Sequence, residues 1–168
     1  MLLNQDVSFE HVRFVSYDAG LAFVDTPRKT LLSKGDRLFR LDYMATNQWA
    51  TQIWWMQAPV FQTLLDRAEN DSEKFRSLAE SGLALPPVQS WVADAKGGPP
   101  KPGDTYTRLA VTEIELKRPV YAWVGIAAAH KEQKGGLEQV MLPNLYIRGD
   151  QFHSNHAALR HTRLIQVK

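Results

Sequence analysis

Two stretches between residues 59 and 82 carry apolar side chains at helical spacing. Pro59 suits the first turn of a helix, because its missing N–H has no partner to lose there. The residues that then share one face are Val60, Phe61, Leu64, Leu65 and Ala68. The pattern predicts a helix that starts near Pro59 and buries this face.

A second helix is predicted directly after the first. Asp71 or Ser72 can cap its N-terminus, since short polar side chains accept the free backbone N–H groups of a first turn. Its apolar stripe consists of Phe75, Leu78 and Ala79. Gly82 is expected to end this helix in the left-handed conformation.

The C-terminal part of the chain changes to the pattern of strands. Residues 96–103, Lys-Gly-Gly-Pro-Pro-Lys-Pro-Gly, indicate an exposed loop. Runs rich in β-branched and aromatic residues follow at 109–116, 120–126, 139–142 and 163–167. These runs predict a mainly antiparallel sheet.

The N-terminal part contributes less regular signals. Residues 9–24 hold two apolar groups around Tyr17-Asp-Ala-Gly20, which indicates a loose hairpin. Thr26-Pro27 opens a basic connector, Lys34-Gly-Asp36 is a turn, and residues 37–41 form a strand with Leu38 and Arg40 on one side. The order of elements predicts an α+β fold with helices of the first half packed on the sheet, in one globular domain over residues 1–168.

Composition narrows the classes of protein. A hydrophobic fraction of 44% with 23% charged residues is that of a folded chain. The absence of cysteine excludes disulfide frameworks, thiolate metal sites and cysteine nucleophiles. A formal charge of +2 is too balanced to indicate a nucleic-acid partner. No secretory leader or spanning segment is evident, so we expect a cytoplasmic site of action without a membrane partner; delivery by a specialised secretion system would leave no such mark.

Tryptophans gather in one segment, residues 47–56, which holds Trp49, Trp54 and Trp55. Indoles of this kind are anchors of a core, because they bring a large apolar area and one N–H that needs a partner. An alternative is a stacking wall for a planar ligand such as nicotinamide or adenine. The two interpretations differ in whether an indole is exposed.

Two distant motifs carry a resemblance to a known family. The first is Leu38-Phe-Arg40 in an early strand, and the second is Gly135-Gly-Leu-Glu-Gln-Val-Met-Leu-Pro143. An aromatic-arginine pair, then helices, then a glycine-rich approach to a Glu-Gln strand resembles the ADP-ribosyltransferase and NAD-glycohydrolase toxin superfamily. The resemblance implies an ADP-ribosyltransferase-like split sheet and NAD as the substrate.

The resemblance also implies roles for individual residues. Arg40 would bind the NAD phosphates, for which a guanidinium is suited by paired charge-assisted hydrogen bonds. Gln139 would match the late catalytic position, with Glu138 beside it. The family's middle motif, which lines the nicotinamide pocket, has candidates at Trp49-Ala-Thr51 and Gln89-Ser-Trp91, so Trp49 and Thr51 are candidate cofactor-binding residues. Cleavage passes through an oxocarbenium-like state, which a carboxylate can stabilise.

Other interpretations of these side chains stay open. Glu113 and Glu115 have the spacing that places both carboxylates on one strand face, and they compete with Glu138 and Gln139 as the late acidic motif. As purely structural groups they would belong to the solvated face of an edge strand. Arg40 could form a structural ion pair, and Glu138 could be a surface carboxylate. Three histidines at 153, 156 and 161 lack the nearby carboxylate or cysteine of a zinc site, which favours a polar helix or loop.

Two hypotheses about function follow. The first is an NAD-consuming enzyme, either an ADP-ribosyltransferase or an NAD glycohydrolase, of the type found in bacterial toxins or effectors, with a target or inhibitor protein as partner. The second is a non-enzymatic interaction domain, such as an adaptor, antitoxin or phage accessory protein, that uses exposed tryptophans and the Pro/Gly loop. The sequence leaves hydrolysis against transfer, the partner and the oligomeric state open.

Overall fold

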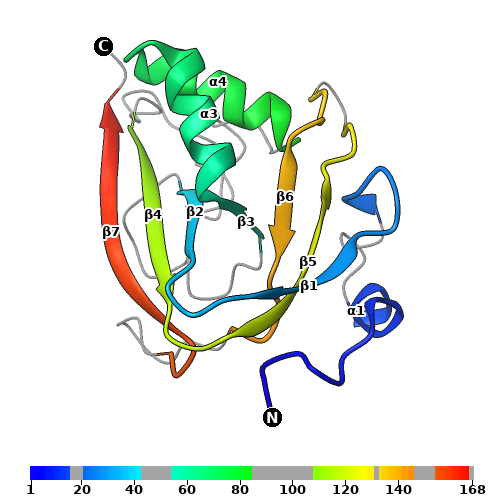
Figure 1. Cartoon of the computed structure of the whole chain (residues 1–168). Coiled ribbons are helices and arrows are strands. Elements are labelled where there is room, and N and C mark those ends of the chain that lie inside the picture. The colour runs from blue at the N-terminus through cyan, green and yellow to red at the C-terminus, as the bar shows by residue number, and fades with distance from the viewer. Residues whose placement is uncertain (16–20, 43–53, 85–107, 131–132, 146–153, 167–168) are drawn as a thin grey trace, which may run out of the picture.

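A computed structural model describes residues 1–15, 21–42, 54–84, 108–130, 133–145 and 154–166. Figure 1 shows the arrangement of its helices and strands. In chain order these are α1 (Phe9–Val15), β1 (Arg28–Leu32), β2 (Arg37–Asp42), β3 (Trp54–Gln57), α3 (Ala58–Ala68), α4 (Ser72–Gly82), β4 (Arg108–Leu116), β5 (Val120–Ile126), β6 (Glu138–Met141) and β7 (Ala157–Gln166).

The seven strands form one sheet in the order β1-β5-β6-β3-β2-β4-β7. Every pair of neighbouring strands is antiparallel. The sheet bends strongly, so that β1 and β5 turn across the direction of β4 and β7 (Figure 1). The predicted α+β class with an antiparallel sheet is confirmed.

The two central helices are confirmed as predicted. Leu64 and Ala68 of α3 are buried, and Leu65 is the member of the expected face that remains exposed. Asp71 caps α4, because its Oδ1 accepts hydrogen bonds from the backbone N–H groups of Glu73 and Lys74, both at 2.9 Å. Phe75 and Ala79 are buried beneath α4.

The predicted end of α4 is wrong in its detail. Gly82 is still helical, and the left-handed residue is Ala84, with φ 52°. The reason for glycine at position 82 is space rather than backbone angle, since a Cβ there would collide with the side chain of Leu137. The end of α4 is thereby docked closely against the segment that leads into β6.

The predicted N-terminal hairpin is also wrong. Residues 9–15 form the helix α1, in which Ser8 Oγ accepts a hydrogen bond from the His11 backbone N–H at 3.1 Å. Phe9 and Val12, three residues apart, lie on one helical face and pack with Phe23 and Trp123. This tertiary contact favours the helix over the short strand that β-branched and aromatic residues suggested.

At three places the structure has strands where the sequence predicted none. β1 occupies part of the expected connector, and β3 includes the end of the tryptophan-rich segment, from Trp54 to Gln57. β7 begins at Ala157, six residues before the predicted run at 163, and takes up the second half of the histidine-containing tail that was expected to be helix or loop. The predicted turn at 34–36 is confirmed, with Asp36 Oδ2 accepting from the Ser33 N–H at 2.8 Å.

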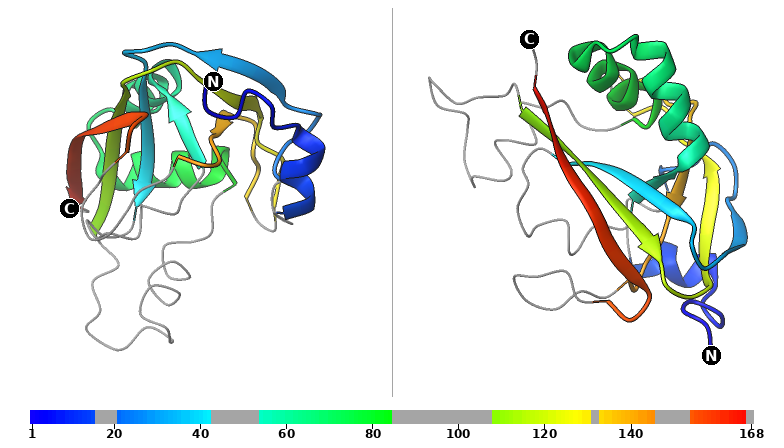
Figure 2. Two further views of the ribbon diagram at one scale, coloured as in Figure 1. Left: turned by 90° about the horizontal axis from the view of Figure 1, so that it is seen from below. Right: turned by 60° about the vertical axis from the view of Figure 1, so that its left-hand side comes forward.

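The two faces of the sheet differ in what covers them. One, here called the helix face, carries Phe39, Trp54, Met56 and Met141 and is covered by α3 and α4 and, at another part, by α1 (Figure 2). The other, here called the inner face, is the one onto which the sheet bends. Its buried cluster consists of Leu32, Leu38, Trp55, Ile114, Leu116, Val120, Ala122, Val124, Val140, Leu142, Leu145 and Ala157.

Helices in the described part of the chain are all too short or too polar to cross a lipid bilayer.

Candidate functional site

Arg40 lies at the centre of the sheet, on the inner face of β2. Its side chain alternates with Phe39 and Leu41, which belong to the helix-face core, as the sequence predicted. The residue is only 5% exposed, and its guanidinium carbon lies 4.8 Å from the centroid of the Trp55 ring. Thr112, directly opposite Arg40 on β4, is fully buried. Arg40 is therefore a buried cation stacked on an aromatic ring.

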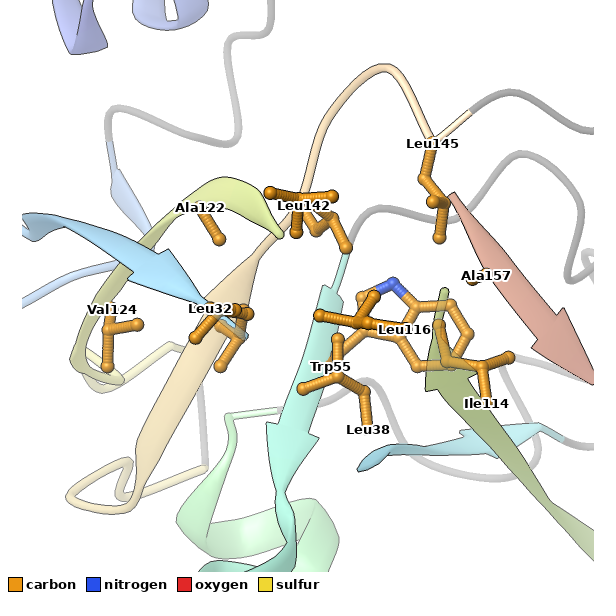
Figure 3. Packing of buried hydrophobic residues seen from close by; sticks show 12 residues of the cluster. Leu32, Leu38, Trp55, Ile114, Leu116, Ala122, Val124, Leu142, Leu145 and Ala157 are labelled. Atoms are coloured by element: carbon orange, nitrogen blue, oxygen red, sulfur yellow. The ribbon is translucent and has the colours of Figure 1, made fainter. Parts of the chain in front are cut away.

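Trp55 is fixed by apolar packing on the inner face. Figure 3 shows its indole between Leu38, Leu116 and Ile114, with the ring nitrogen on the side of Leu142 and Leu145. The residue is 2% exposed, and within the described chain its Nε1 is buried without a hydrogen-bond partner. Burial of an N–H without a partner costs free energy. The favourable contributions of this indole are therefore its buried apolar area and the ring face that contacts Arg40.

Glu138 is the first residue of β6 and lies on the same face as Arg40. β6 pairs with β3 through Trp55 and Val140, both on the inner face, and Glu138 is two residues from Val140. Its carboxylate is 3.8 Å from the Arg28 guanidinium, a partly exposed pair. Such a pair contributes about 0–1 kcal/mol, so it leaves Glu138 able to exchange partners.

The register gives the separation of Arg40 and Glu138. Only β3 lies between their strands, with Leu38 opposite Gln57 and Trp55 opposite Val140. Continued along the strands, this register offsets the two residues by two positions. Two strand spacings and two residues of rise place their Cα atoms about 12 Å apart. Because both side chains lie on the inner face, an extended ligand that crosses β3 can contact both.

Gln139 points to the other side of the sheet. Its neighbours Val140 and Met141 belong to different faces, and Gln139 shares the helix face with Met141. It is 5% exposed, and its Nε2 donates to the Ala22 backbone carbonyl at 2.8 Å. The structure thus brings Arg40 and Glu138 to one face and leaves Gln139 on the other, where its amide holds the segment before β1. A catalytic role for Gln139 stays a prediction.

A close docking fixes the segment before Glu138. Gly135, at φ 70°, donates its N–H to the Ser81 carbonyl of α4, and Leu137 donates to the Gly82 carbonyl. A Cβ at Gly135 would collide with the Ala127 backbone, so this glycine permits the close approach. The glycine-rich approach seen in the sequence therefore ties the start of β6 to α4 and β5.

The competing acidic pair occupies a different environment. Glu113 and Glu115 share a face, as their spacing predicts, but Glu113 lies opposite Phe39 on the helix face, away from Arg40. The expected solvated edge strand is wrong, because β4 lies between β2 and β7 and Glu113 is buried. Arg37 forms an ion pair with Glu113, and Arg160 forms one with Glu115 at 3.2 Å. These contacts give both carboxylates a structural role.

The remaining candidates fall into two groups. Trp49, Thr51, the Gln89-Ser-Trp91 alternative and the Pro/Gly loop lie outside the described residues. Trp55 and Trp123 are buried core anchors, whereas Trp54 is partly exposed and contacts Phe23, with ring centroids 5.8 Å apart. In the described residues no group of three or more histidine or acidic side chains is placed to hold a metal.

Sequence reasoning missed one partner in this site and one unusual acid. The sequence predicted Trp55 to be a core anchor or a ligand platform, whereas in the structure its ring contacts the Arg40 guanidinium. This contact between adjacent strands could have been predicted only if their register had been known. Glu80 on α4 was not singled out, yet burial raises its pKa to about 7, although Arg76 opposes the rise. The sequence signal for this acid was that it directly follows Ala79, a residue of the apolar stripe of α4.

Comparisons with known proteins found two structures of distant similarity and no match by sequence. No family model matches the sequence, and no curated protein matches it. The structure of Tne2 in complex with Tni2 is similar in fold, with a TM-score of 0.49 and 13% identity over 84% of this chain and 94% of that chain. Rhs1-CT in complex with its cognate immunity protein RhsI1 is similar with a TM-score of 0.46 and 17% identity, over 86% and 84% of the two chains. No site residue is transferred from either.

Proposed function

We propose that this protein consumes NAD by cleaving the bond between nicotinamide and ribose. The observation that carries the proposal is the placement of Arg40 on β2 and Glu138 on β6, on one face of the sheet, with only β3 between these two strands. The strands bearing the resembling early arginine and late acidic motifs, far apart in sequence, are thus brought together at the middle of the sheet. A separation of about 12 Å suits a dinucleotide that touches one residue with its phosphates and the other with a ribose.

In this proposal Arg40 holds the pyrophosphate. A planar guanidinium matches two phosphate oxygens with parallel hydrogen bonds. Its burial strengthens the interaction, because the surroundings screen charge less than water does. Arg40 thus fixes the ligand without taking part in bond cleavage.

Glu138 acts on the ribose next to nicotinamide. The glycosidic C–N bond breaks, its electron pair goes to the pyridine ring, and nicotinamide leaves uncharged. Positive charge then develops on the ribose, where the Glu138 carboxylate stabilises it. Water, or a nucleophilic group of a target protein, adds to the ribose carbon and loses a proton to solvent, which gives hydrolysis or ADP-ribosyl transfer. Gln139 positions the segment around Ala22 from the other face.

The direct test is nicotinamide release from NAD, followed by chromatography. Arg40→Ala is expected to lower kcat/KM by about 10- to 100-fold, the loss that goes with a charged hydrogen bond. Arg13→Ala is the matched control, because Arg13 is half exposed on α1 and pairs only with nearby Glu10 among the contacts of the described chain. Absence of nicotinamide release by the wild-type protein would sink the proposal, as would full activity of a folded Arg40→Ala variant.

Binding of an inhibitor or target protein is a second candidate function. Val24 and Ile126 are 61% and 43% exposed and adjacent, since the Val24 N–H donates to the Ile126 carbonyl at 3.0 Å. Ile126 faces Glu138 across β5 and β6, so a protein that covered this corner would also cover Glu138. A co-purified partner that loses affinity on Val24→Asp, but not on Leu65→Asp on α3, would support it; equal losses would oppose it.

A further inference from the structure

We infer that Trp55 is a positioning residue for Arg40, holding its guanidinium ready for the phosphates of the ligand; this rests on the proposed function. The contact itself is the first observation. The guanidinium carbon of Arg40 lies 4.8 Å from the indole centroid, within the range of a cation–π interaction. Both residues are buried on the same face, Arg40 at 5% and Trp55 at 2% exposure.

The indole is a rigid support. It packs with side chains of β2, β4 and β6 and of the residue after β6, namely Leu38, Ile114, Val140 and Leu142, each 0% exposed. Figure 3 shows Leu38, Ile114 and Leu142 around the indole. Close-packed rings of this kind have one orientation available. An arginine stacked on it therefore loses less freedom when a ligand binds than a free arginine chain would.

Stacking also leaves the chemistry of the guanidinium unchanged. The guanidinium carbon lies over the ring, 4.8 Å from its centroid, and the N–H donors of a planar guanidinium lie in its own plane. Contact with Trp55 thus orients the plane of the guanidinium, in which its N–H groups would meet phosphate oxygens. The contact with the ring itself does not need an N–H donor. Held at a fixed tilt, the fork of donors selects ligands with two adjacent anionic oxygens, which a pyrophosphate provides.

The unpartnered indole N–H separates this role from hydrogen bonding. Because Trp55 Nε1 has no partner in the described chain, a phenylalanine ring loses no hydrogen bond there. Trp55→Phe keeps a π face beneath Arg40, and Trp55→Leu removes it. If Trp55 were needed only for its volume, Trp55→Phe and Trp55→Leu would change the affinity for the ligand to a similar extent after correction for stability.

The test is calorimetric titration of the folded proteins with ADP-ribose, which carries the pyrophosphate without the scissile bond. Trp55→Leu is expected to weaken binding about tenfold and Trp55→Phe by about threefold or less. Trp54→Leu is the matched control, since Trp54 is the preceding residue on the opposite face. In an Arg40→Ala background Trp55→Leu should have no further effect, because the interaction it removes is already gone. If Trp55→Leu does not fold, Trp55→Met replaces it as a flexible residue without a ring.

The outcomes separate the two proposals. Wild-type affinity for ADP-ribose in Trp55→Leu or Trp55→Met, or additive losses with Arg40→Ala, would overturn the positioning role and leave the proposed function standing. Failure of the wild-type protein to bind ADP-ribose or to release nicotinamide from NAD would overturn the function itself, and the positioning role with it.

Discussion

Arg40 and Gln139 lie on opposite faces of the sheet, although only β3 separates the strands that carry them. Side chains alternate between the two faces along each strand, so the register of β2, β3 and β6 determines which residues share a face. Because Trp55 pairs with Val140, the member of the Glu138-Gln139 pair that shares the face of Arg40 is Glu138. The Gln139 amide donates to the Ala22 carbonyl on the helix face, whereas the Glu138 carboxylate lies on the inner face, where we propose that the dinucleotide binds.

The ion pair between Arg37 and buried Glu113 should contribute to stability rather than to activity. Glu113 is 3% exposed, and Arg37 is its ion-pair partner on the helix face. Arg37→Ala leaves a buried carboxylate without its partner, for which we expect a loss of about 2–3 kcal/mol in the free energy of unfolding, discounted because Arg37 itself is half exposed. Urea denaturation measures this loss.

The matched control for that pair is the double variant. Arg37→Ala with Glu113→Gln removes the buried charge together with its partner and should recover at least half of the loss. NAD cleavage by the folded protein should be unchanged in both variants. A large loss of activity in Arg37→Ala, at full folding, would instead return Glu113 to consideration as the late acidic motif.

Glu80 should make stability fall as pH rises toward neutrality. Burial raises its pKa from 4.5 to about 7 in the folded protein. Between these values the folded state binds more protons than the unfolded state, so the free energy of unfolding decreases with rising pH. The decrease should amount to about 1–3 kcal/mol, with the upper limit set by the full shift. Thermal unfolding at pH 5 and pH 8 measures it.

Glu80→Gln isolates this effect. Glutamine resembles the protonated acid, so the variant should unfold at a higher temperature than wild type at pH 8 and at nearly the same temperature at pH 5. Glu73→Gln on the exposed first turn of α4 serves as the control, because Glu73 has a side chain that is 60% exposed. An equal gain at both pH values would contradict the assignment to the Glu80 carboxyl.

Asn4 should hold the N-terminal segment to the sheet. Its Nδ2 donates to the carbonyls of Tyr121 at 3.0 Å and Pro143 at 2.8 Å, and its Oδ1 accepts from Asn144. Its φ of 63° is left-handed. Asn4→Ala should lower the free energy of unfolding by about 2–3 kcal/mol, through lost hydrogen bonds and backbone strain. Asn4→Gly should recover about 1 kcal/mol of this, because glycine adopts that angle freely; identical losses would rule out strain.

The elements that the sequence predicted are those whose signal is local. α3 and α4 follow from apolar spacing and from a cap at Asp71, which needs nothing outside the helix. β1 was missed because it is an edge strand that contains Arg28 and Lys29 and buries little besides Leu32. α1 was read as part of a hairpin because its seven residues are stabilised by distant Trp123 rather than by helix propensity.

The candidate site could likewise be predicted from the sequence only as far as its signals are local. Arg40 and the Glu138-Gln139 pair were singled out by the resemblance of their motifs to the toxin superfamily, and the alternation of Leu38, Phe39 and Arg40 was predictable from the strand pattern. Which member of the pair faces Arg40 depends on how β6 aligns with β3, a pairing of residues more than eighty positions apart. Local pattern carries no information on that register. The stacking of Arg40 on Trp55 is hidden for the same reason.

The measurement that bears most directly on the central claim compares nicotinamide release by Glu138→Gln and Gln139→Met, each corrected for its folded fraction. Glu138→Gln should lower kcat by about 100-fold or more, the effect of removing a group that stabilises developing charge. Gln139→Met should cost stability while keeping kcat within about threefold of wild type, because it lies on the other face. The opposite result, an active Glu138→Gln and an inactive but folded Gln139→Met, would contradict the account.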